Sequence, residues 1–258
     1  MSLLITCDTG GWKTPPRLRS RLEDTDLASA GWMIAGSVGI GVSDAVAAGG
    51  VRTSIDRESN FAARRLAHRS GGIAICNEYR ADLIDVGRSP HHRDLFSPAV
   101  RSLPVSTREA IVEEIYTPYR AAVERQVLSL LTSWSYVVHL SVRTFEAKTV
   151  AGSWRRGDVG LLYDPSRRDE VDWCLDLVEE LYAVAPDLKV RRNHPGRGTN
   201  DSLTKTMRGQ FSPNVYLGIE IVLNRAWMAR PLIRRDLMLD RIGDAIGSLT
   251  AEPVVQAA

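Results

Sequence analysis

Short apolar runs alternate along this chain with longer segments whose apolar residues recur at helical spacing. The stretch 136–165 contains two such runs, 137–142 and 159–163, joined by a long polar segment. Both runs are rich in valine and leucine, and the second is closed by Asp164-Pro165, which is typical of strands covered on both faces. Further strands are predicted at residues 3–7, 72–77, 188–191 and 216–223.

Helical periodicity is clearest at residues 107–131 and 169–185. The tetrad Ser106-Thr107-Arg108-Glu109 matches a capping box at the start of the first helix, and Pro118 should kink that helix or split it in two. A closing helix is predicted at 231–250. A weaker, glycine-containing helix is predicted at 31–50, and residues 51–70 are interpreted as loop plus a short helix.

This alternation of strands and helices predicts an α/β fold, a three-layer α/β/α sandwich. No internal repeat or low-complexity linker is present, so residues 1–258 are predicted to form a single domain. In open sheets of this kind, ligands bind in the loops beyond the carboxyl ends of the strands. Arg143, Thr144 and Glu146 follow the first central strand and stand where a site is expected.

Charge and composition narrow the class of protein. The chain carries 33 Lys and Arg against 31 Asp and Glu, so its charge indicates no nucleic-acid partner. The first residues turn acidic at Asp8, too soon for a signal peptide, and no apolar run approaches membrane-spanning length. Cys7, Cys76 and Cys174 lack paired spacing and are predicted to be free thiols. We expect a cytoplasmic protein without a membrane partner.

Glu220 is the sharpest candidate for chemistry, because a carboxylate in an apolar strand must be paired or must ligate something. A strand-end acid paired with a neighbouring arginine is the alternative. His139, in mid-strand, is expected to be a core histidine. Guanidinium groups bind carboxylate and phosphate in a bidentate way, although most surface arginines are simply solvated. The arginines that stand out are Arg143, Arg155, Arg156, Arg191, Arg192, Arg197 and Arg208.

Several short motifs, each weak alone, are specific as a set. They are residues 7–11 (Cys-Asp-Thr-Gly-Gly), 85–88, 116–120, 139–145, 157–165, 191–195, Gly198 with Asp201, and 216–221. In this order they resemble the N-formylglutamate amidohydrolase family over nearly the whole chain. The resemblance implies a fold like that of zinc-dependent exopeptidases, with a mixed central sheet between helix layers. It also implies an ancestral reaction, the zinc-assisted hydrolysis of an N-acyl amino acid such as N-formylglutamate.

The chain departs from the family pattern at positions that zinc chemistry requires. Thr9 and Arg143 stand where the family has histidines, and Met33 stands near an aspartate position. Gly87 replaces an asparagine, and Val222 replaces a second acid of the last strand. A catalytic zinc needs about three His, Asp, Glu or Cys ligands and an open position for water. An arginine at a former ligand position would repel the metal.

We therefore expect a family member without zinc-dependent hydrolysis and without a cofactor. It would retain an arginine-lined pocket for an anionic, carboxylate-bearing small molecule. Glu220 is the candidate catalytic residue, and no metal ligands are predicted. The residues expected to bind the ligand or shape its loop are Asp8, Thr9, Arg143, Arg156, Asn193, Arg197 and Asp201.

The alternative is an active amidohydrolase whose zinc site has been rebuilt. Cys7, Asp8 and Glu220 are the candidates for such a site, although Cys7 and Asp8 should point to opposite faces of a strand. A weaker interpretation is an inert pocket on a protein that acts through assembly, so a protein partner or a homo-oligomer is left open.

Overall fold

The predicted apolar runs pair into one six-stranded sheet in the computed structural model, which describes residues 2–23 and 56–250. The strand order is β2-β1-β3-β6-β4-β5. Neighbouring strands are parallel except β4 and β6, which are antiparallel, so the sheet is mixed as expected. The strands are β1 (Leu3–Cys7), β2 (Ile73–Cys76), β3 (Val137–Phe145), β4 (Val159–Leu162), β5 (Val190–Arg192) and β6 (Tyr216–Asn224).

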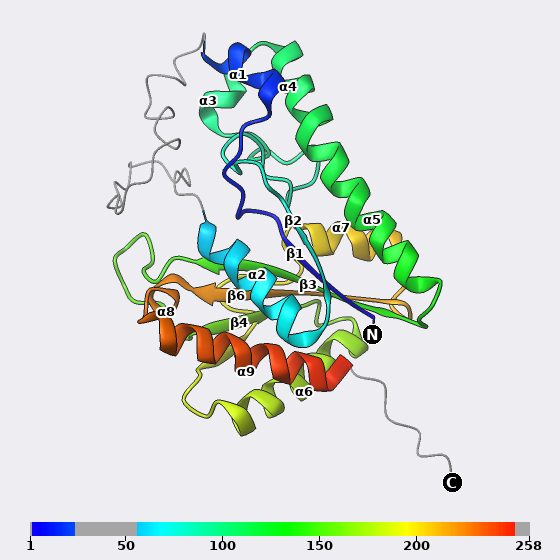
Figure 1. Ribbon diagram of the computed structural model, residues 1–258, viewed down its shortest axis with the longest axis vertical. Coiled ribbons are helices and arrows are strands. Elements are labelled where there is room, and N and C mark those ends of the chain that lie inside the picture. Colours follow the sequence, from blue (N-terminus) through cyan, green and yellow to red (C-terminus); the bar gives the residue numbers. More distant parts are fainter. Residues whose placement is uncertain (1, 24–55, 251–258) are drawn as a thin grey trace.

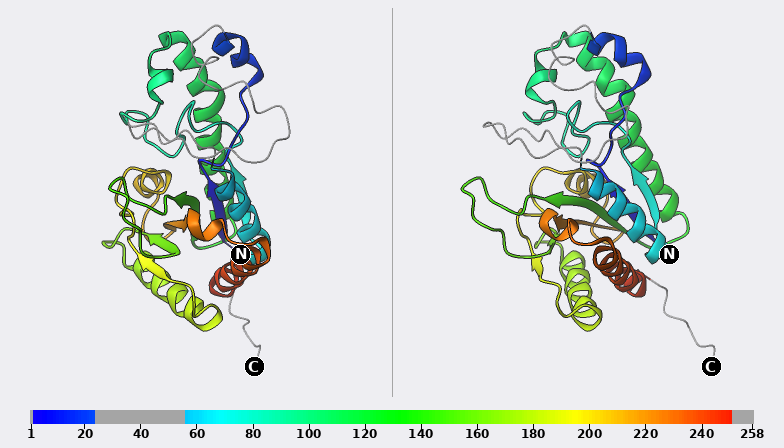
Figure 2. Two further views of the ribbon diagram at one scale, coloured as in Figure 1. Left: turned by 90° about the vertical axis from the view of Figure 1, so that its left-hand side faces the viewer. Right: turned by 60° about the vertical axis from the view of Figure 1, so that its left-hand side comes forward.

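Helices cover both faces of this sheet (Figures 1 and 2). Helices α2, α6 and α9 lie on one face, and α5 and α7 lie on the other, which confirms the predicted three layers. The helices are α1 (Pro16–Glu23), α2 (Arg57–Ser70), α3 (Pro98–Arg101), α4 (Val105–Ile111), α5 (Thr117–Leu131), α6 (Arg168–Val184), α7 (Leu203–Gln210), α8 (Arg225–Met228) and α9 (Leu232–Thr250).

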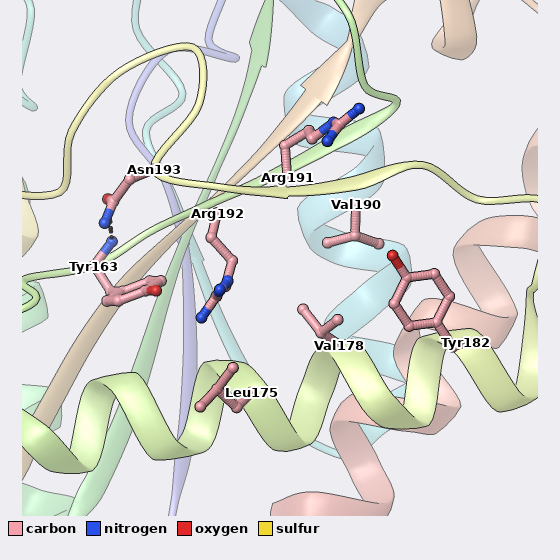
Figure 3. A pocket seen from close by; sticks show the side chains of 8 residues that line it. All are labelled: Tyr163, Leu175, Val178, Tyr182, Val190, Arg191, Arg192 and Asn193. Carbon is pink, nitrogen blue, oxygen red and sulfur yellow. Dashed lines mark hydrogen bonds between the residues drawn. The ribbon is translucent and has the colours of Figure 1, made fainter.

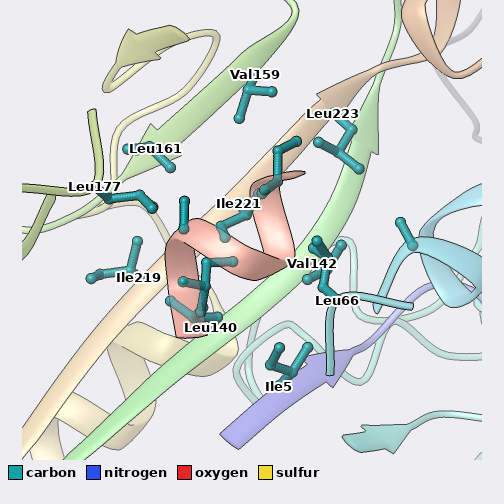
Figure 4. Close-up of a cluster of buried hydrophobic side chains, with 14 of the residues drawn as sticks. Ile5, Leu66, Leu140, Val142, Val159, Leu161, Leu177, Ile219, Ile221 and Leu223 are labelled. Atoms are coloured by element: carbon teal, nitrogen blue, oxygen red, sulfur yellow. The ribbon is translucent and has the colours of Figure 1, made fainter. Parts of the chain in front are cut away.

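Two hydrophobic cores lie on the two faces of the sheet, because successive side chains of a strand point to opposite sides. Ile5, Leu140 and Ile221 belong to the core under α2, α6 and α9 (Figure 4). Leu4, one residue before Ile5, and Val137, three residues before Leu140, therefore point to the other face and belong to the core under α5. Strands β1, β3 and β6 are buried along their whole length, as the apolar runs predicted.

The long helix predicted at 107–131 is interrupted, as Pro118 indicated. A π-helical turn, Val112–Tyr116, separates α4 from α5, and Pro118 lies in the first turn of α5. The predicted capping box at residues 106–109 is wrong. Helix α4 begins at Val105 after Pro104, which has no side-chain donor or acceptor to cap it, so the fixed proline backbone starts the helix before Ser106.

Two other helices differ from the sequence prediction. Helix α2 is 14 residues long, where only a short helix was expected. Helix α7 was not predicted; it begins after Ser202, whose hydroxyl accepts a hydrogen bond from the Lys205 amide (3.2 Å). The helix predicted at 31–50 lies outside the described residues. In the part of the chain that is described, no helix has the length and apolar content needed to cross a membrane.

Candidate functional site

Three charged side chains meet at the carboxyl ends of β1, β3 and β6, on the face that α5 covers. We call Asp8, Arg143 and Glu220 the α5-side cluster. The Arg143 Nη2 atom lies 3.4 Å from Glu220 Oε2 and 3.7 Å from Asp8 Oδ2. All three side chains are nearly inaccessible to solvent. Glu220 is therefore paired with an arginine, which was one of the two interpretations of an acid in this strand.

Hydroxyl groups hold the two carboxylates in place. The Tyr119 hydroxyl of α5 donates to Asp8 Oδ1 (2.7 Å), and Ser141 Oγ donates to Asp8 Oδ2 (3.2 Å). Thr204 Oγ1, on α7, donates to Glu220 Oε1 (3.4 Å). Burial and the neighbouring Asp8 charge raise the pKa of Tyr119 well above its usual value, so the phenol keeps its proton and remains a donor.

Arg143 carries a fixed positive charge in this cluster. Burial alone would disfavour that charge, but the carboxylates of Glu220 and Asp8 outweigh it and raise the pKa of Arg143. The cluster therefore combines the N–H donors of one guanidinium with the acceptor oxygens of two carboxylates, so it can both donate and accept hydrogen bonds.

The loop around Gly87 covers the cluster. A β-carbon on Gly87 would lie 3.0 Å from Asp8 Oδ2 and 3.2 Å from Arg143 Nη2, so a larger residue there would require these side chains to shift. Arg120, next to Tyr119 on α5, donates to the carbonyl oxygens of Gly87 and Arg88. The loop therefore brings Arg88, Arg120 and Arg143 into one neighbourhood.

Five guanidinium nitrogens of these three arginines are buried without a hydrogen bond to the described residues, although Arg143 Nη2 lies 3.4 Å from Glu220 Oε2 and Arg88 Nε lies 3.3 Å from Asp85 Oδ2. They are Arg143 Nε and Nη2, Arg120 Nε and Nη1, and Arg88 Nε. A buried donor without an acceptor costs about 1–3 kcal/mol, so such a group indicates an acceptor from outside the chain. Arg88 and Arg120 were absent from the predicted site, although both lie in the motif segments 85–88 and 116–120.

Thr9 lies on the opposite face of the sheet, because it is one residue beyond Asp8. Its hydroxyl donates to Asp56 Oδ2 (3.2 Å), and the Thr144 amide and hydroxyl donate to the same carboxylate (3.2 and 2.7 Å). Arg225 Nε donates to Thr144 Oγ1 (3.0 Å). We call Thr9, Asp56, Thr144 and Arg225 the α2-side cluster; its contacts are those of a structural network.

The loop residues of the predicted site lie apart from the α5-side cluster. The Asn193 side chain accepts hydrogen bonds from the backbone amides of Tyr163 (3.2 Å) and Gly198 (3.0 Å). Asp201 Oδ2 accepts one from the Ser89 amide (3.0 Å), which ties this loop to the loop that contains Gly87. Arg156 and Arg197 are exposed, and neither forms an ion pair with Asp8 or Glu220 among the described residues. A role for these residues in ligand binding stays a prediction.

Two predictions about buried residues are confirmed. The Cys7 thiol contacts Ser59 Oγ of α2 (3.1 Å), so Cys7 and Asp8 do point to opposite faces. His139 is fully buried, with Nε2 2.9 Å from Thr6 Oγ1 and Nδ1 2.6 Å from the Tyr216 hydroxyl. Burial, with some contribution from Arg208 and Arg120, lowers the pKa of His139 to about 3.

The donor set at the strand ends is unlike a zinc site. No group of three His, Cys, Asp or Glu side chains is placed to hold a metal ion in residues 2–23 and 56–250. Asp8 and Glu220 share the Arg143 guanidinium, and Cys7 faces away from them. Burial raises the pKa of Cys7 above its usual value, so the thiol keeps its proton beside Ser59.

Comparisons with known proteins agree with the motifs. Residues 1–225 match the model of a family described as N-formylglutamate amidohydrolase. No curated protein sequence matches the chain.

Solved structures share the fold at low sequence identity. A gene product of Agrobacterium tumefaciens is 18% identical, with a TM-score of 0.68 over 97% of this chain and 92% of that one. An N-formylglutamate amidohydrolase from Ralstonia eutropha is 15% identical, with a TM-score of 0.63 over 95% of this chain and 91% of that one. A metallo-carboxypeptidase from Burkholderia cenocepacia scores only 0.36, too low to bear on function.

Proposed function

We propose, since this chain belongs to the N-formylglutamate amidohydrolase family, that it binds a carboxylate-bearing small molecule at the α5-side cluster without zinc-dependent hydrolysis. The observation that carries the proposal is the set of buried guanidinium nitrogens without a hydrogen bond on Arg88, Arg120 and Arg143. Arg120 Nε and Nη1 and Arg143 Nε also have no ion pair with the described residues. A ligand carboxylate supplies the acceptor oxygens that these nitrogens lack.

The donor set supports the proposal that this chain does not use zinc. Zinc requires three protein ligands in a tetrahedral arrangement with an open position. Here a permanently charged guanidinium lies against both carboxylates that a metal would use, Asp8 and Glu220. The guanidinium engages the carboxylate oxygens that a metal would need, and this supports the proposal that the residues present do not fit zinc.

The same cluster suggests the rest of the ligand. Asp8 and Glu220 are acceptors beside the arginine donors, and the second lone pairs of their oxygens suit an N–H or O–H group. An N-acyl amino acid carries both features, a carboxylate and an amide N–H. This is the chemistry of the molecule after which the family is named. Glu220 would then orient the amide rather than hold a metal.

Calorimetric titration with N-formylglutamate tests the proposal, together with zinc content and formate release after equilibration with zinc. We expect saturable binding, no retained zinc and no formate. Arg143→Lys keeps the charge that Asp8 and Glu220 require but loses the planar fork, so it should weaken binding about tenfold or more. The matched control is Arg93→Gln, whose guanidinium side chain is 88% exposed.

Two results would contradict the proposal in different ways. Stoichiometric zinc with chelator-sensitive formate release would establish the alternative, an active amidohydrolase with a rebuilt site. Absence of binding, or equal binding by wild type and Arg143→Lys, would remove the ligand role of the cluster.

A further inference from the structure

A second candidate binding site lies at the edge of the sheet, on the face opposite to the α5-side cluster. A cavity of about 540 Å³ lies between the edge strand β5 and helix α6 (Figure 3). Its volume falls within the range of about 300–1,000 Å³ that is usual for small-molecule sites. The lining residues are Tyr163, Leu175, Val178, Tyr182, Val190, Arg191, Arg192 and Asn193.

One wall of the cavity is apolar and accessible. Leu175, Val178 and Tyr182 follow one another along α6 at helical spacing, so they form a continuous stripe facing β5. Leu175 is 42% exposed and Tyr182 is 56% exposed. Covering exposed apolar surface of this kind with an apolar group is favourable, because it removes that surface from water.

The opposite wall carries an arginine without an ionic partner. Figure 3 shows the Arg192 side chain extending from β5 toward α6, while Arg191 extends the other way. Arg191 packs across Gly157, whose absent β-carbon would lie 2.8 Å from Arg191 Cγ. Neither arginine forms an ion pair or a side-chain hydrogen bond with any residue that the structure describes. Arg192 thus places a free positive charge beside an apolar wall.

We propose that this cavity binds an organic monocarboxylate with an apolar tail. The carboxylate meets the Arg192 guanidinium, and the tail lies along Leu175, Val178 and Val190. The alternative role of Arg192 is to protect an exposed sheet edge from pairing with another chain. Edge protection needs charge alone, whereas the proposal needs both the charge and the apolar wall.

Titration calorimetry with decanoate and with acetate, at constant ionic strength and below the micelle concentration, tests the proposal. We expect one saturable decanoate site and no saturation with acetate, which has the charge but no tail. Arg192→Gln should weaken decanoate binding about tenfold, as for a lost charged hydrogen bond. Leu175→Asn should also weaken it. Arg234→Gln, which removes another exposed arginine on α9, should bind like wild type.

The proposal is overturned if wild type shows no saturable decanoate binding, or if Arg192→Gln binds decanoate as wild type does. Edge protection is then the remaining role, and Arg192→Gln should aggregate faster than Arg234→Gln. Excess N-formylglutamate should not displace decanoate, because the two sites lie on opposite faces of the sheet. Displacement would place decanoate in the α5-side cluster and also overturn the proposal.

Discussion

The α5-side and α2-side clusters lie at the same strand ends, one on each face of the sheet, and they differ in how completely their polar groups are paired. In the α2-side cluster, Asp56 accepts hydrogen bonds from Thr9, Ser59 and Thr144. In the α5-side cluster, two Arg143 nitrogens are buried without a hydrogen bond to the described residues, and one of them, Nη2, has only the longer ion-pair contacts with Glu220 and Asp8.

This difference in hydrogen bonding indicates that one cluster stabilises the fold and that the other is suited to bind a ligand. A saturated network has no free hydrogen-bonding capacity for a ligand, so its contribution is to the free energy of unfolding. Unsatisfied donors lower stability and are retained where another molecule completes them. We therefore expect the two clusters to respond oppositely to mutation: one in stability, the other in affinity.

The largest effect is expected for Asp56→Ala. This change removes the shared acceptor of Thr9, Thr144 and the start of α2, and should lower the free energy of unfolding by about 3 kcal/mol. Urea denaturation measures this loss. Binding of N-formylglutamate should stay as in wild type for the folded fraction.

The control is Asp94→Ala, whose carboxylate lies on the surface 3.5 Å from Arg93 and should cost less than about 0.5 kcal/mol. If Asp56→Ala kept the free energy of unfolding of wild type but bound N-formylglutamate more weakly, the roles assigned to the two clusters would be reversed.

A smaller effect per pH unit is expected through His139, beneath the α5-side cluster. Its pKa is about 3 in the folded protein, against an ordinary 6.5, so the unfolded chain binds the extra proton first as pH falls. The stabilising contribution of neutral His139 is complete above pH 6.5 and is lost toward pH 3, by about 1.4 kcal/mol per pH unit.

Urea denaturation between pH 4 and pH 7 measures that slope in wild type and in His139→Gln, whose amide does not titrate. The variant should show a shallower slope. Equal slopes would mean that His139 is not held neutral.

The smallest effect is expected for Tyr119→Phe, which removes one hydrogen bond to Asp8 (2.7 Å) and nothing else of size. It should lower the free energy of unfolding by about 1 kcal/mol, since Ser141 and Arg143 still support the carboxylate. Thermal unfolding with and without N-formylglutamate would show whether the ligand compensates the loss. A loss above about 3 kcal/mol would mean that the cluster depends on this phenol for folding.

Much of the fold could be predicted from local patterns. The apolar runs indicated every strand of the sheet, and strand alternation correctly separated Cys7 from Asp8. Helix starts were harder, because Pro104 overrides a capping box that looks complete in sequence. Helix α7 was missed because a run of polar residues conceals it.

The candidate cluster could be predicted from the sequence only where its residues depend on strand register. Arg143 and Glu220 follow from their places on β3 and β6, and Asp8 from the end of β1. Arg120 and Arg88 come from a helix and a loop far away in sequence, and only tertiary packing brings them to Arg143. No periodicity reports such contacts, although both residues lie in the motif segments 85–88 and 116–120.

The close approach of Gly87 to Arg143 makes the volume of one loop residue part of the geometry of the α5-side cluster. A β-carbon at position 87 would lie 3.2 Å from Arg143 Nη2 and 3.0 Å from Asp8 Oδ2, closer than most β-carbons come to a neighbour. A larger residue there would require the guanidinium to shift, so a change of residue in the loop would be transmitted to the end of β3.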